Sequence, residues 1–135
     1  MDPERLMELA QEAKERAYAP YSGFKVGAVV LTRRGGVYLG CNVENASLGL
    51  TVCAERVAVF RAVSEGDVEI EAVVIVTDGE EPVAPCGACR QVLREFGTTT
   101  VMSQSAGTKK RTWTLDELLP VPFDGSSFLT SGKDS

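Results

Sequence analysis

Residues 71–77 read Glu-Ala-Val-Val-Ile-Val-Thr, and this stretch decides the class of fold. Its centre, residues 72–76, is a continuous apolar run between two polar residues. Such a run predicts a strand that is buried on both faces of its sheet. Helices must then cover both faces of that sheet, which predicts an α/β fold.

The segments on either side of this strand supply the helices and the other strands. Asp2 can cap a first helix, and Pro3 suits its first turn. Thr114 and Glu117 have capping-box spacing for a last, short helix. We expect helices at 3–18, 53–64, 86–96 and 114–119, and strands at 24–31, 37–43, 71–77 and 98–104. The alternation of strands and helices predicts crossovers onto a mostly parallel sheet.

The composition indicates a single soluble domain. The chain has 135 residues, of which 44% are hydrophobic, and a formal net charge of -5. Its Lys and Arg residues form no long block, which argues against a nucleic-acid partner. The first ten residues are charged and lack the apolar centre of a secretory signal. No stretch approaches the ~18 consecutive apolar residues that a membrane helix needs. We therefore expect a cytoplasmic protein with no membrane partner.

The chemistry of the chain is limited by its cysteines and by the absence of histidine. The cysteines are Cys41, Cys53, Cys86 and Cys89. In a reducing compartment such a set is more often metal-binding or catalytic than disulfide-bonded. Without histidine, proton transfer must fall to carboxylates, cysteines, lysines or tyrosines.

Three of these cysteines can hold one zinc ion. Cys86 and Cys89 lie three residues apart at the expected start of one helix, and Cys53 lies at the start of another. Helix N-termini favour thiolates. Three protein ligands with one position left open are typical of a catalytic zinc site, and that position would hold water. Zinc fits better than a redox metal because the reaction inferred below needs only a Lewis acid.

A carboxylate and two arginines accompany these ligands. Glu55, two residues after Cys53, can reach both a metal-bound water and a substrate, which predicts a proton shuttle. Three thiolates make the metal a poorer acid, and we expect Arg56 and Arg90 to offset their charge.

Two other interpretations of the cysteines remain open at this point. The CxxC pair could be a redox dithiol or half of a structural zinc site. Cys41 could also close a structural site with four thiolates. Its place in an expected strand, without a CxxC partner, favours a buried or free thiol instead.

The cysteine motifs resemble the signature of zinc-dependent nucleoside and nucleobase deaminases. Cys53-Ala-Glu55 and Pro85-Cys-Gly-Ala-Cys89 carry the resemblance, which is a known pattern that includes a form with three cysteines and a non-ligand glutamate. Three further segments resemble the short, free-nucleoside cytidine deaminases: Tyr18–Gly27 (YAPYSGFKVG), Cys41–Ser47 (CNVENAS) and Leu118–Phe123 (LLPVPF).

The resemblance implies a three-layer fold with a mixed five-stranded sheet covered by helices. It also implies one zinc ion per subunit and a homotetramer with composite active sites. The implied reaction is hydrolytic deamination of cytidine and deoxycytidine, in pyrimidine salvage. The resemblance covers roughly residues 5–123, so we expect a single catalytic domain at 1–123. Residues 124–135 would form a polar tail that is either disordered or in contact with another subunit.

The resemblance also assigns roles residue by residue. Cys53, Cys86 and Cys89 match the zinc ligands, and Glu55 matches the proton shuttle. Phe24 matches a residue that packs against the pyrimidine ring, and the Ala54 N–H matches a contact to the pyrimidine carbonyl. Asn42 and Glu44 match residues that hydrogen-bond the ribose hydroxyls, and Phe123 matches an aromatic that a neighbouring subunit inserts over the substrate. Without the resemblance, Phe24 and Phe123 could simply be packing residues, and Asn42 and Glu44 surface residues on one strand face. Leu48 replaces a tyrosine that is usual in the family, near the sugar and the subunit contact.

Three rival functions follow from the same residues. A deaminase of this fold could act on a nucleoside antibiotic such as blasticidin S, which Leu48 and the unmatched tail leave open. It could act on a base within RNA or DNA, against which the acidic charge argues. The chain could also be an inactive, zinc-stabilised module, against which Glu55 argues, because a structural zinc site has no use for that carboxylate.

Overall fold

The structure is a computed structural model that describes residues 1–128. Its helices and strands follow one another along the chain as α1 (Pro3–Lys14), β1 (Val26–Thr32), β2 (Val37–Cys41), α2 (Ala54–Ser64), β3 (Ile70–Thr77), α3 (Gly87–Glu95), β4 (Thr100–Gln104), β5 (Lys110–Thr114) and α4 (Leu115–Leu118). Two short 3₁₀ turns occur at Leu48–Leu50 and Gly125–Ser127. No helix within residues 1–128 has the length and apolar character to cross a membrane.

The five strands form one mixed sheet in the order β2-β1-β3-β4-β5. Only β3 and β4 pair in parallel; the other neighbours are antiparallel. The expectation of a mostly parallel sheet is therefore wrong. The crossover through α2 does join two strands of the same direction, β2 and β3, but β1 lies between them and turns both contacts antiparallel. The mixed five-stranded sheet implied by the resemblance is confirmed.

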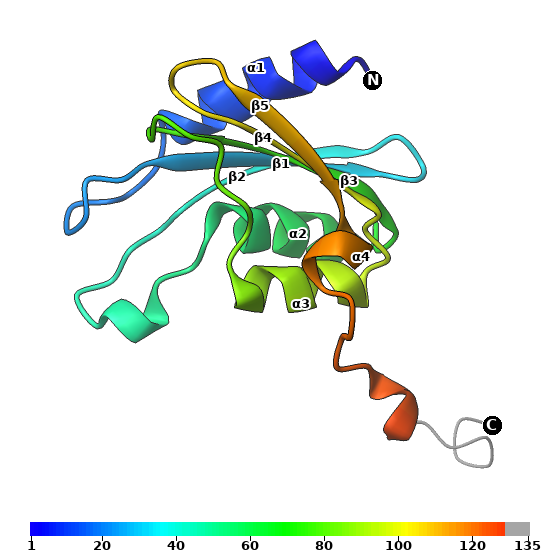
Figure 1. The fold of residues 1–135 in the computed structure, drawn as a ribbon. Coiled ribbons are helices and arrows are strands. Elements are labelled where there is room, and N and C mark those ends of the chain that lie inside the picture. The colour runs from blue at the N-terminus through cyan, green and yellow to red at the C-terminus, as the bar shows by residue number, and fades with distance from the viewer. Residues whose placement is uncertain (129–135) are drawn as a thin grey trace.

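The helices lie in layers on both faces of the sheet (Figure 1). On one face α1 packs against apolar side chains of β1 and β3. On the other face α2, α3 and α4 pack against the alternate side chains of the same strands. The central run of β3 contributes Val73 and Ile75 to one core and Val74 and Val76 to the other. The three-layer α/β architecture is therefore confirmed, and it rests on the stretch at 71–77.

Two glycines let helices approach the sheet closely. A Cβ at Gly27 of β1 would lie 2.0 Å from the carbonyl oxygen of Ala10 in α1. A Cβ at Gly40 of β2 would lie 2.4 Å from the backbone nitrogen of Ala58 in α2. Both separations are far below van der Waals contact, so each position requires glycine. The short distance at Gly40 brings the start of α2 close to the end of β2.

Several element ends differ from the sequence expectation. The first helix stops at Lys14 instead of residue 18, and the first strand begins at Val26, so that Phe24 precedes it. The second strand ends at Cys41, although 37–43 was expected. Asn42 and Glu44 therefore lie in the segment after the strand, where Val43 makes isolated bridges to the chain on both sides.

A buried carboxylate closes the end of the sheet opposite these loops. Asp67 is 2% exposed, and its Oδ2 accepts hydrogen bonds from Thr32 Oγ1 (2.8 Å) and from the Tyr38 hydroxyl (3.1 Å). The guanidinium of Arg34 lies 3.3 Å from Oδ1. These contacts fasten the turn between β1 and β2 to the loop before β3. The hydrogen bond from the Tyr38 hydroxyl, added to burial, raises the pKa of that tyrosine.

We predict that Asp67→Ala lowers the free energy of unfolding by about 3 kcal/mol, because two hydroxyls lose a charged acceptor. Urea denaturation measures the change. Asp116→Ala is the matched control, because its ion pair with Arg94 is exposed and such pairs contribute at most about 1 kcal/mol. Equal losses in the two variants would contradict this account.

Candidate active site

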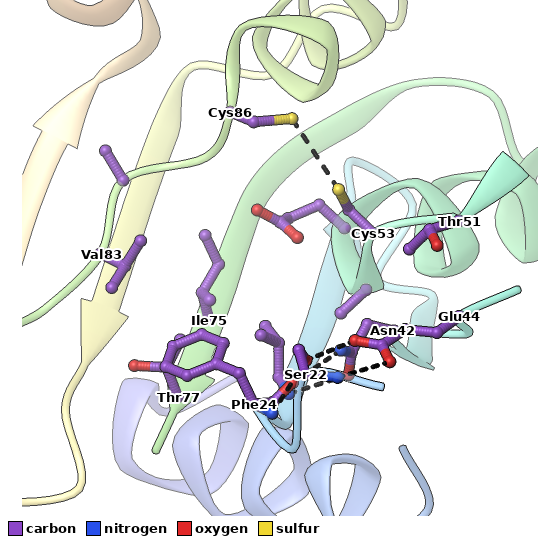
Figure 2. A pocket seen from close by; sticks show the side chains of 14 residues that line it. Ser22, Phe24, Asn42, Glu44, Thr51, Cys53, Ile75, Thr77, Val83 and Cys86 are labelled. Atoms are coloured by element: carbon purple, nitrogen blue, oxygen red, sulfur yellow. Dashed lines mark hydrogen bonds between the residues drawn. The ribbon is translucent and has the colours of Figure 1, made fainter. Parts of the chain in front are cut away.

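Three cysteine sulfurs meet where two helices begin. Cys53 is the N-cap of α2, Cys86 is the N-cap of α3, and Cys89 lies in the first turn of α3. Their Sγ atoms all lie within 4.8 Å of one another. The Sγ atoms of Cys53 and Cys86 are 3.8 Å apart (Figure 2), and those of Cys86 and Cys89 are 3.4 Å apart. The structure therefore brings together the three cysteines that the sequence singled out.

The separation of these sulfurs fits a zinc ion. A tetrahedral zinc with Zn–S bonds of about 2.3 Å places its sulfurs about 3.8 Å apart. Cys41, at the end of β2, does not join the cluster, because its Sγ contacts the carbonyl oxygen of Arg16 at 3.4 Å. Within residues 1–128 no other group of acidic or cysteine side chains has this geometry. Among the described residues the site thus offers three cysteine sulfurs and no fourth protein ligand, which is the donor set of a catalytic zinc site.

The electrostatics of the cluster also favour a cation. The pKa of Cys53 is lowered to about 5 by a hydrogen bond from the Cys89 thiol and by the guanidinium of Arg56, whose Nη2 lies 3.5 Å from the sulfur. The pKa of Cys89 is raised, because its thiol donates to the ionised Cys53 and is buried. The cluster on its own thus holds one thiolate readily and resists a second. A bound cation removes that resistance, so the charge distribution fits a metal.

A buried carboxyl group stands beside the thiols. Glu55 is the second residue of α2 and is 6% exposed. Burial, and then the neighbouring charge of Cys53, raises the pKa of Glu55 to about 7. A carboxyl group with a pKa in this range can accept and release a proton near neutral pH. Glu55 lines the same cavity as Cys53 and Cys86.

That cavity has a volume of about 360 Å³ and opens between the N-terminus of α2 and the loop after β3. Its volume lies within the usual range for small-molecule sites, ~300–1,000 Å³. The fourteen lining residues are Ser22, Phe24, Val26, Asn42, Glu44, Thr51, Cys53, Ala54, Glu55, Ile75, Thr77, Val83, Ala84 and Cys86. Six of them have apolar side chains, and the groups able to act on a substrate gather at two places: the cysteines with Glu55, and Asn42 with Glu44.

Asn42 and Glu44 hold the turn that carries Phe24. Asn42 Oδ1 accepts from the Val26 N–H (2.9 Å), and its Nδ2 donates to the Phe24 carbonyl (2.8 Å). Glu44 Oε1 accepts from the backbone N–H groups of Tyr21 (2.9 Å) and Ser22 (3.1 Å), and its Oε2 accepts from the Ser22 hydroxyl. These hydrogen bonds lower the pKa of Glu44, the one from the Ser22 hydroxyl most of all. Figure 2 shows this network at one side of the cavity, beside the Phe24 ring.

Two other predicted residues lie outside the cavity. Phe123 is 65% exposed and follows α4 on a segment that runs away from the sheet and helices (Figure 1). Its backbone carbonyl oxygen and N–H bond to the side chain of Gln91. Leu48 is 65% exposed in the projecting turn at 48–50. Neither side chain contributes to the cavity of its own chain.

The two arginines beside the ligands have different partners. Arg56 contacts Cys53, as described above, and the negative charge there raises its own pKa. Arg90 instead donates from Nε to the Pro85 carbonyl (2.7 Å) and from Nη1 to the Leu118 carbonyl (2.9 Å). Both contacts are to backbone carbonyl oxygens and neither is to a cysteine sulfur, so they do not support the expectation that Arg90 offsets the charge of the thiolates. Arg90 holds the residue before Cys86 and ties it to the end of α4.

About half of the residues that line the cavity were not expected from the sequence. Ser22 could have been found, because it lies two residues before Phe24 in a turn whose backbone needs capping. Its hydroxyl accepts from the Phe24 N–H (3.0 Å) and donates to Glu44. Val83, Ala84 and Thr77 carry no local signal, because only the fold brings them to the cavity.

Comparison with known proteins places this site in a family. Residues 1–105 match the family model described as the cytidine and deoxycytidylate deaminase zinc-binding region. The chain belongs to the cytidine and deoxycytidylate deaminase family. The matched residues contain every zinc-ligand candidate and Glu55, so the thiol cluster described above lies within the zinc-binding region of this family.

Relatives within the family are similar over almost their whole length. The cytidine deaminase of Sporosarcina psychrophila is 46% identical over 125 residues, which cover 91% of this chain and 92% of that protein. The cytidine deaminase of Halalkalibacterium halodurans is 47% identical over 91% of this chain and 95% of its own length. A crystal structure of cytidine deaminase from Burkholderia pseudomallei matches with a TM-score of 0.87 at 46% identity, over 91% of this chain and all of that one. The family and the fold are thus confirmed.

Proposed function

We propose that this protein is a zinc-dependent cytidine deaminase, which hydrolyses cytidine and deoxycytidine to uridine and deoxyuridine with release of ammonia. The observation that carries the proposal is the position of Glu55, whose buried carboxyl group lines the same cavity as the thiol cluster and has its pKa raised to about 7. Relatives of this chain at 46% and 47% identity are named cytidine deaminases, which supports the same reaction.

Cys53, Cys86 and Cys89 would hold one zinc ion per subunit, and Glu55 would move the protons. Bound zinc supplies a water acidic enough to attack at neutral pH, since zinc lowers the pKa of water from ~15.7 to ~7. A carboxylate oxygen of Glu55 takes up the proton that the attacking water loses. The same oxygen would give it to the ring nitrogen next to the amine-bearing carbon. Glu55 would then take the proton of the newly added hydroxyl group and pass it to the amine, so that the carbon–nitrogen bond breaks as the carbonyl group of uridine forms. Ammonia leaves and uridine remains.

The pyrimidine ring would lie between Phe24 and the N-terminus of α2. Phe24 is 38% exposed and lines the cavity, and its backbone is held in place by Asn42 and Ser22. The first N–H groups of a helix have no acceptor within that helix. Ala54 is the first residue of α2 and lines the cavity, so its N–H is available to the pyrimidine carbonyl oxygen.

The hydrogen-bonding capacity left on Asn42 and Glu44 matches one sugar hydroxyl. Asn42 Nδ2 has two N–H groups and uses one of them within the protein. Glu44 Oε2 accepts one hydrogen bond and has room for another. The free N–H can donate to a hydroxyl oxygen while the same hydroxyl donates to Glu44. A second hydroxyl would find no further N–H on these two side chains, so only one is held by both a donor and an acceptor.

This capacity predicts how the enzyme treats deoxynucleosides. Because deoxycytidine, which lacks the 2′-hydroxyl, is among the proposed substrates, we assign the doubly bonded hydroxyl to the 3′ position. We therefore expect 2′-deoxycytidine to be deaminated with a kcat/KM within about tenfold of that for cytidine, whereas 3′-deoxycytidine loses about 100-fold or more. The larger loss arises because buried polar groups built to bind a hydroxyl are left unpaired when it is absent. Steady-state kinetics with the three nucleosides measure both ratios. Equal losses for the two deoxynucleosides would contradict the assignment of Asn42 and Glu44.

We assign to Arg56 the role of reducing the negative charge that three thiolates place on the zinc ion. Its contact with Cys53 supports this role. Arg56→Ala is expected to weaken zinc retention and to shift the pH–rate profile. If both stay unchanged, Arg56 has no such role.

We further propose a homotetramer in which Phe123 enters the cavity of a neighbouring subunit. The exposed ring on an extended segment, outside the cavity of its own chain, supports this arrangement. Exposed apolar side chains on α2 and the nearby loops offer a surface for subunit contact: Phe60, Leu48, Leu50 and Tyr21. In this proposal residues 1–123 form one catalytic domain and the tail from 124 contacts a neighbour; residues 129–135 of that tail lie outside the described part. Light scattering during size-exclusion chromatography tests the tetramer, and a fully active monomer would remove Phe123 from the site.

A parallel assay separates this function from its rivals. The zinc-loaded protein is given cytidine, deoxycytidine, cytosine, blasticidin S and a single-stranded oligonucleotide. We expect turnover of the two nucleosides only, since the cavity holds a sugar-binding pair and the net charge of -5 disfavours nucleic acid. Turnover of the antibiotic or the oligonucleotide alone would replace the proposed substrate, and no turnover at all would favour an inactive zinc module. With nucleosides as substrates, the enzyme would act in pyrimidine salvage in the cytoplasm.

A further inference from the structure

The loop between β3 and α3 forms one wall of the cavity and is anchored at both ends. The Gly79 carbonyl accepts from the Ala106 N–H (2.9 Å), and the Pro85 carbonyl accepts from Arg90 Nε (2.7 Å). Val83 and Ala84 of this loop line the cavity (Figure 2), and no helix or strand is formed between residues 78 and 86. Val83 lies across the cavity from Asn42 and Glu44. Across the described residues, a single hydrogen bond ties the backbone of residues 80–84 to the rest of the domain, and it is donated by the Val83 N–H.

The acceptor of that hydrogen bond is a fully buried serine on the sheet. Ser103 of β4 is 0% exposed, and its Oγ lies 3.1 Å from the Val83 nitrogen. Ser103 pairs with Ile75 of β3, which itself lines the cavity. Two residues earlier on the same strand face, Val101 belongs to the hydrophobic core. A hydroxyl in such a place is unfavourable unless it makes a hydrogen bond, so its contact with Val83 has a specific structural consequence.

We propose that Ser103 is a positioning residue for substrate binding, which acts by holding Val83 and the loop around it at the distance from the sheet that fits a pyrimidine nucleoside. The inference rests on the proposed function, because it names the wall that such a substrate would touch. Without the Ser103 hydroxyl, the Val83 N–H loses its acceptor and the loop moves outward to reach water. The substrate must then restore the closed wall when it binds, which raises KM, while the thiol cluster and Glu55 keep their places on α2 and α3.

A neighbouring serine provides a matched control. Ser105 is 1% exposed, and its Oγ accepts from the Lys109 N–H at 3.1 Å, the same distance as in the contact of Ser103 with Val83. That hydrogen bond closes the turn between β4 and β5. The turn contacts the loop at Gly79, through the Ala106 N–H (2.9 Å), and at Glu81, through the Lys109 side chain, but not at the lining residues Val83 and Ala84. Ser103→Ala and Ser105→Ala therefore remove similar buried hydrogen bonds, only one of which ends on a residue of the cavity wall.

The experiment compares these two variants with the wild-type holoenzyme. Ser103→Ala is expected to raise KM for cytidine about tenfold with kcat within about threefold, and Ser105→Ala to leave KM within about twofold. Zinc content should stay at one per chain in all three proteins, and urea denaturation should give similar losses of stability for the two variants. Ser103→Thr keeps the hydroxyl and should return KM to within about threefold of wild type.

Hydrogen exchange of the peptide 79–85, followed by mass spectrometry, tests the anchor independently of turnover. We expect faster exchange in Ser103→Ala than in wild type or Ser105→Ala. Unchanged exchange in Ser103→Ala would overturn the proposal whether or not the protein deaminates cytidine. A protein that deaminates no cytidine would refute the proposed function, which is a separate outcome. With an active wild type, an unchanged KM in Ser103→Ala, or an equal rise in both alanine variants, would also overturn it.

Discussion

Glu55→Gln is expected to lower kcat for cytidine by about 10⁴-fold while the protein keeps its zinc. Positioned acid–base groups typically contribute ~10²–10⁴-fold, and Glu55 is asked to transfer protons at more than one step of the same turnover. Glutamine preserves the volume of a side chain that is 6% exposed, so packing at the start of α2 should be retained. It cannot accept a proton, and this is the property under test. Single-turnover and steady-state rates, with zinc measured on the same samples, give the result.

The control for this variant is Glu65→Gln, which makes the same chemical change at the other end of α2. Glu65 is the exposed C-cap residue of that helix and lies outside the cavity. Its kcat should stay within about twofold of wild type, because an exposed substitution away from the site changes little. A Glu55→Gln enzyme with near-normal kcat would contradict the proton-shuttle role.

Cys86→Ala is expected to lose zinc, and activity with it. Loss of a group that merely orients a ligand costs ~10–100-fold in metal affinity, so loss of a ligand itself should cost more than about 100-fold. The three sulfurs lie within 4.8 Å of one another, and without Cys86 only two of them remain as zinc ligands. Dialysis against a chelator followed by elemental analysis measures the zinc retained per chain.

Cys41→Ala is the matched control for the metal centre, because Cys41 is also a free thiol but contacts the carbonyl oxygen of Arg16 instead of the cluster. We expect the Cys41→Ala protein to retain zinc and activity. Zinc loss from Cys41→Ala, or full retention by Cys86→Ala, would disprove the assignment of the three ligands.

The metal centre could be predicted from the sequence because its residues depend on local structure. Cys86 and Cys89 lie in one helical turn, and Cys53 precedes Glu55 at a second helix start, so spacing predicts each pair, whereas the fold brings the two helix starts together. The central strand could also be predicted, because a continuous apolar run such as 72–76 is typical of a strand that is buried on both faces of its sheet. These local patterns account for the α/β class and for the chemistry of the site.

The rest depends on contacts that no local pattern encodes. Strand β5 contains Lys110 and Arg111, and its exposed side chains lack the alternation that marks a half-buried strand, so it was not expected. The position of β1 between β2 and β3 is a property of the whole sheet. Asn42 and Glu44 were expected on a strand face but lie in the segment after it, where they bind the backbone of the turn before β1.

The loop wall of the cavity illustrates the same limit. Val83 is an ordinary apolar residue in a polar loop, and Ser103 is an ordinary polar residue in a strand. Their contact joins residues that are 20 apart in the chain, one in the loop after β3 and the other in β4. Only the folded chain reveals that the strand supports the loop.

The most direct test of the central claim is to follow ammonia and uridine together as the zinc-loaded protein acts on free cytidine. Hydrolytic deamination predicts that each cytidine consumed yields one uridine and one ammonia, and that removal of zinc abolishes both products while its return restores them. Cytidine that remains unchanged in the presence of the zinc-loaded protein would contradict the account, as would equal turnover after zinc has been removed.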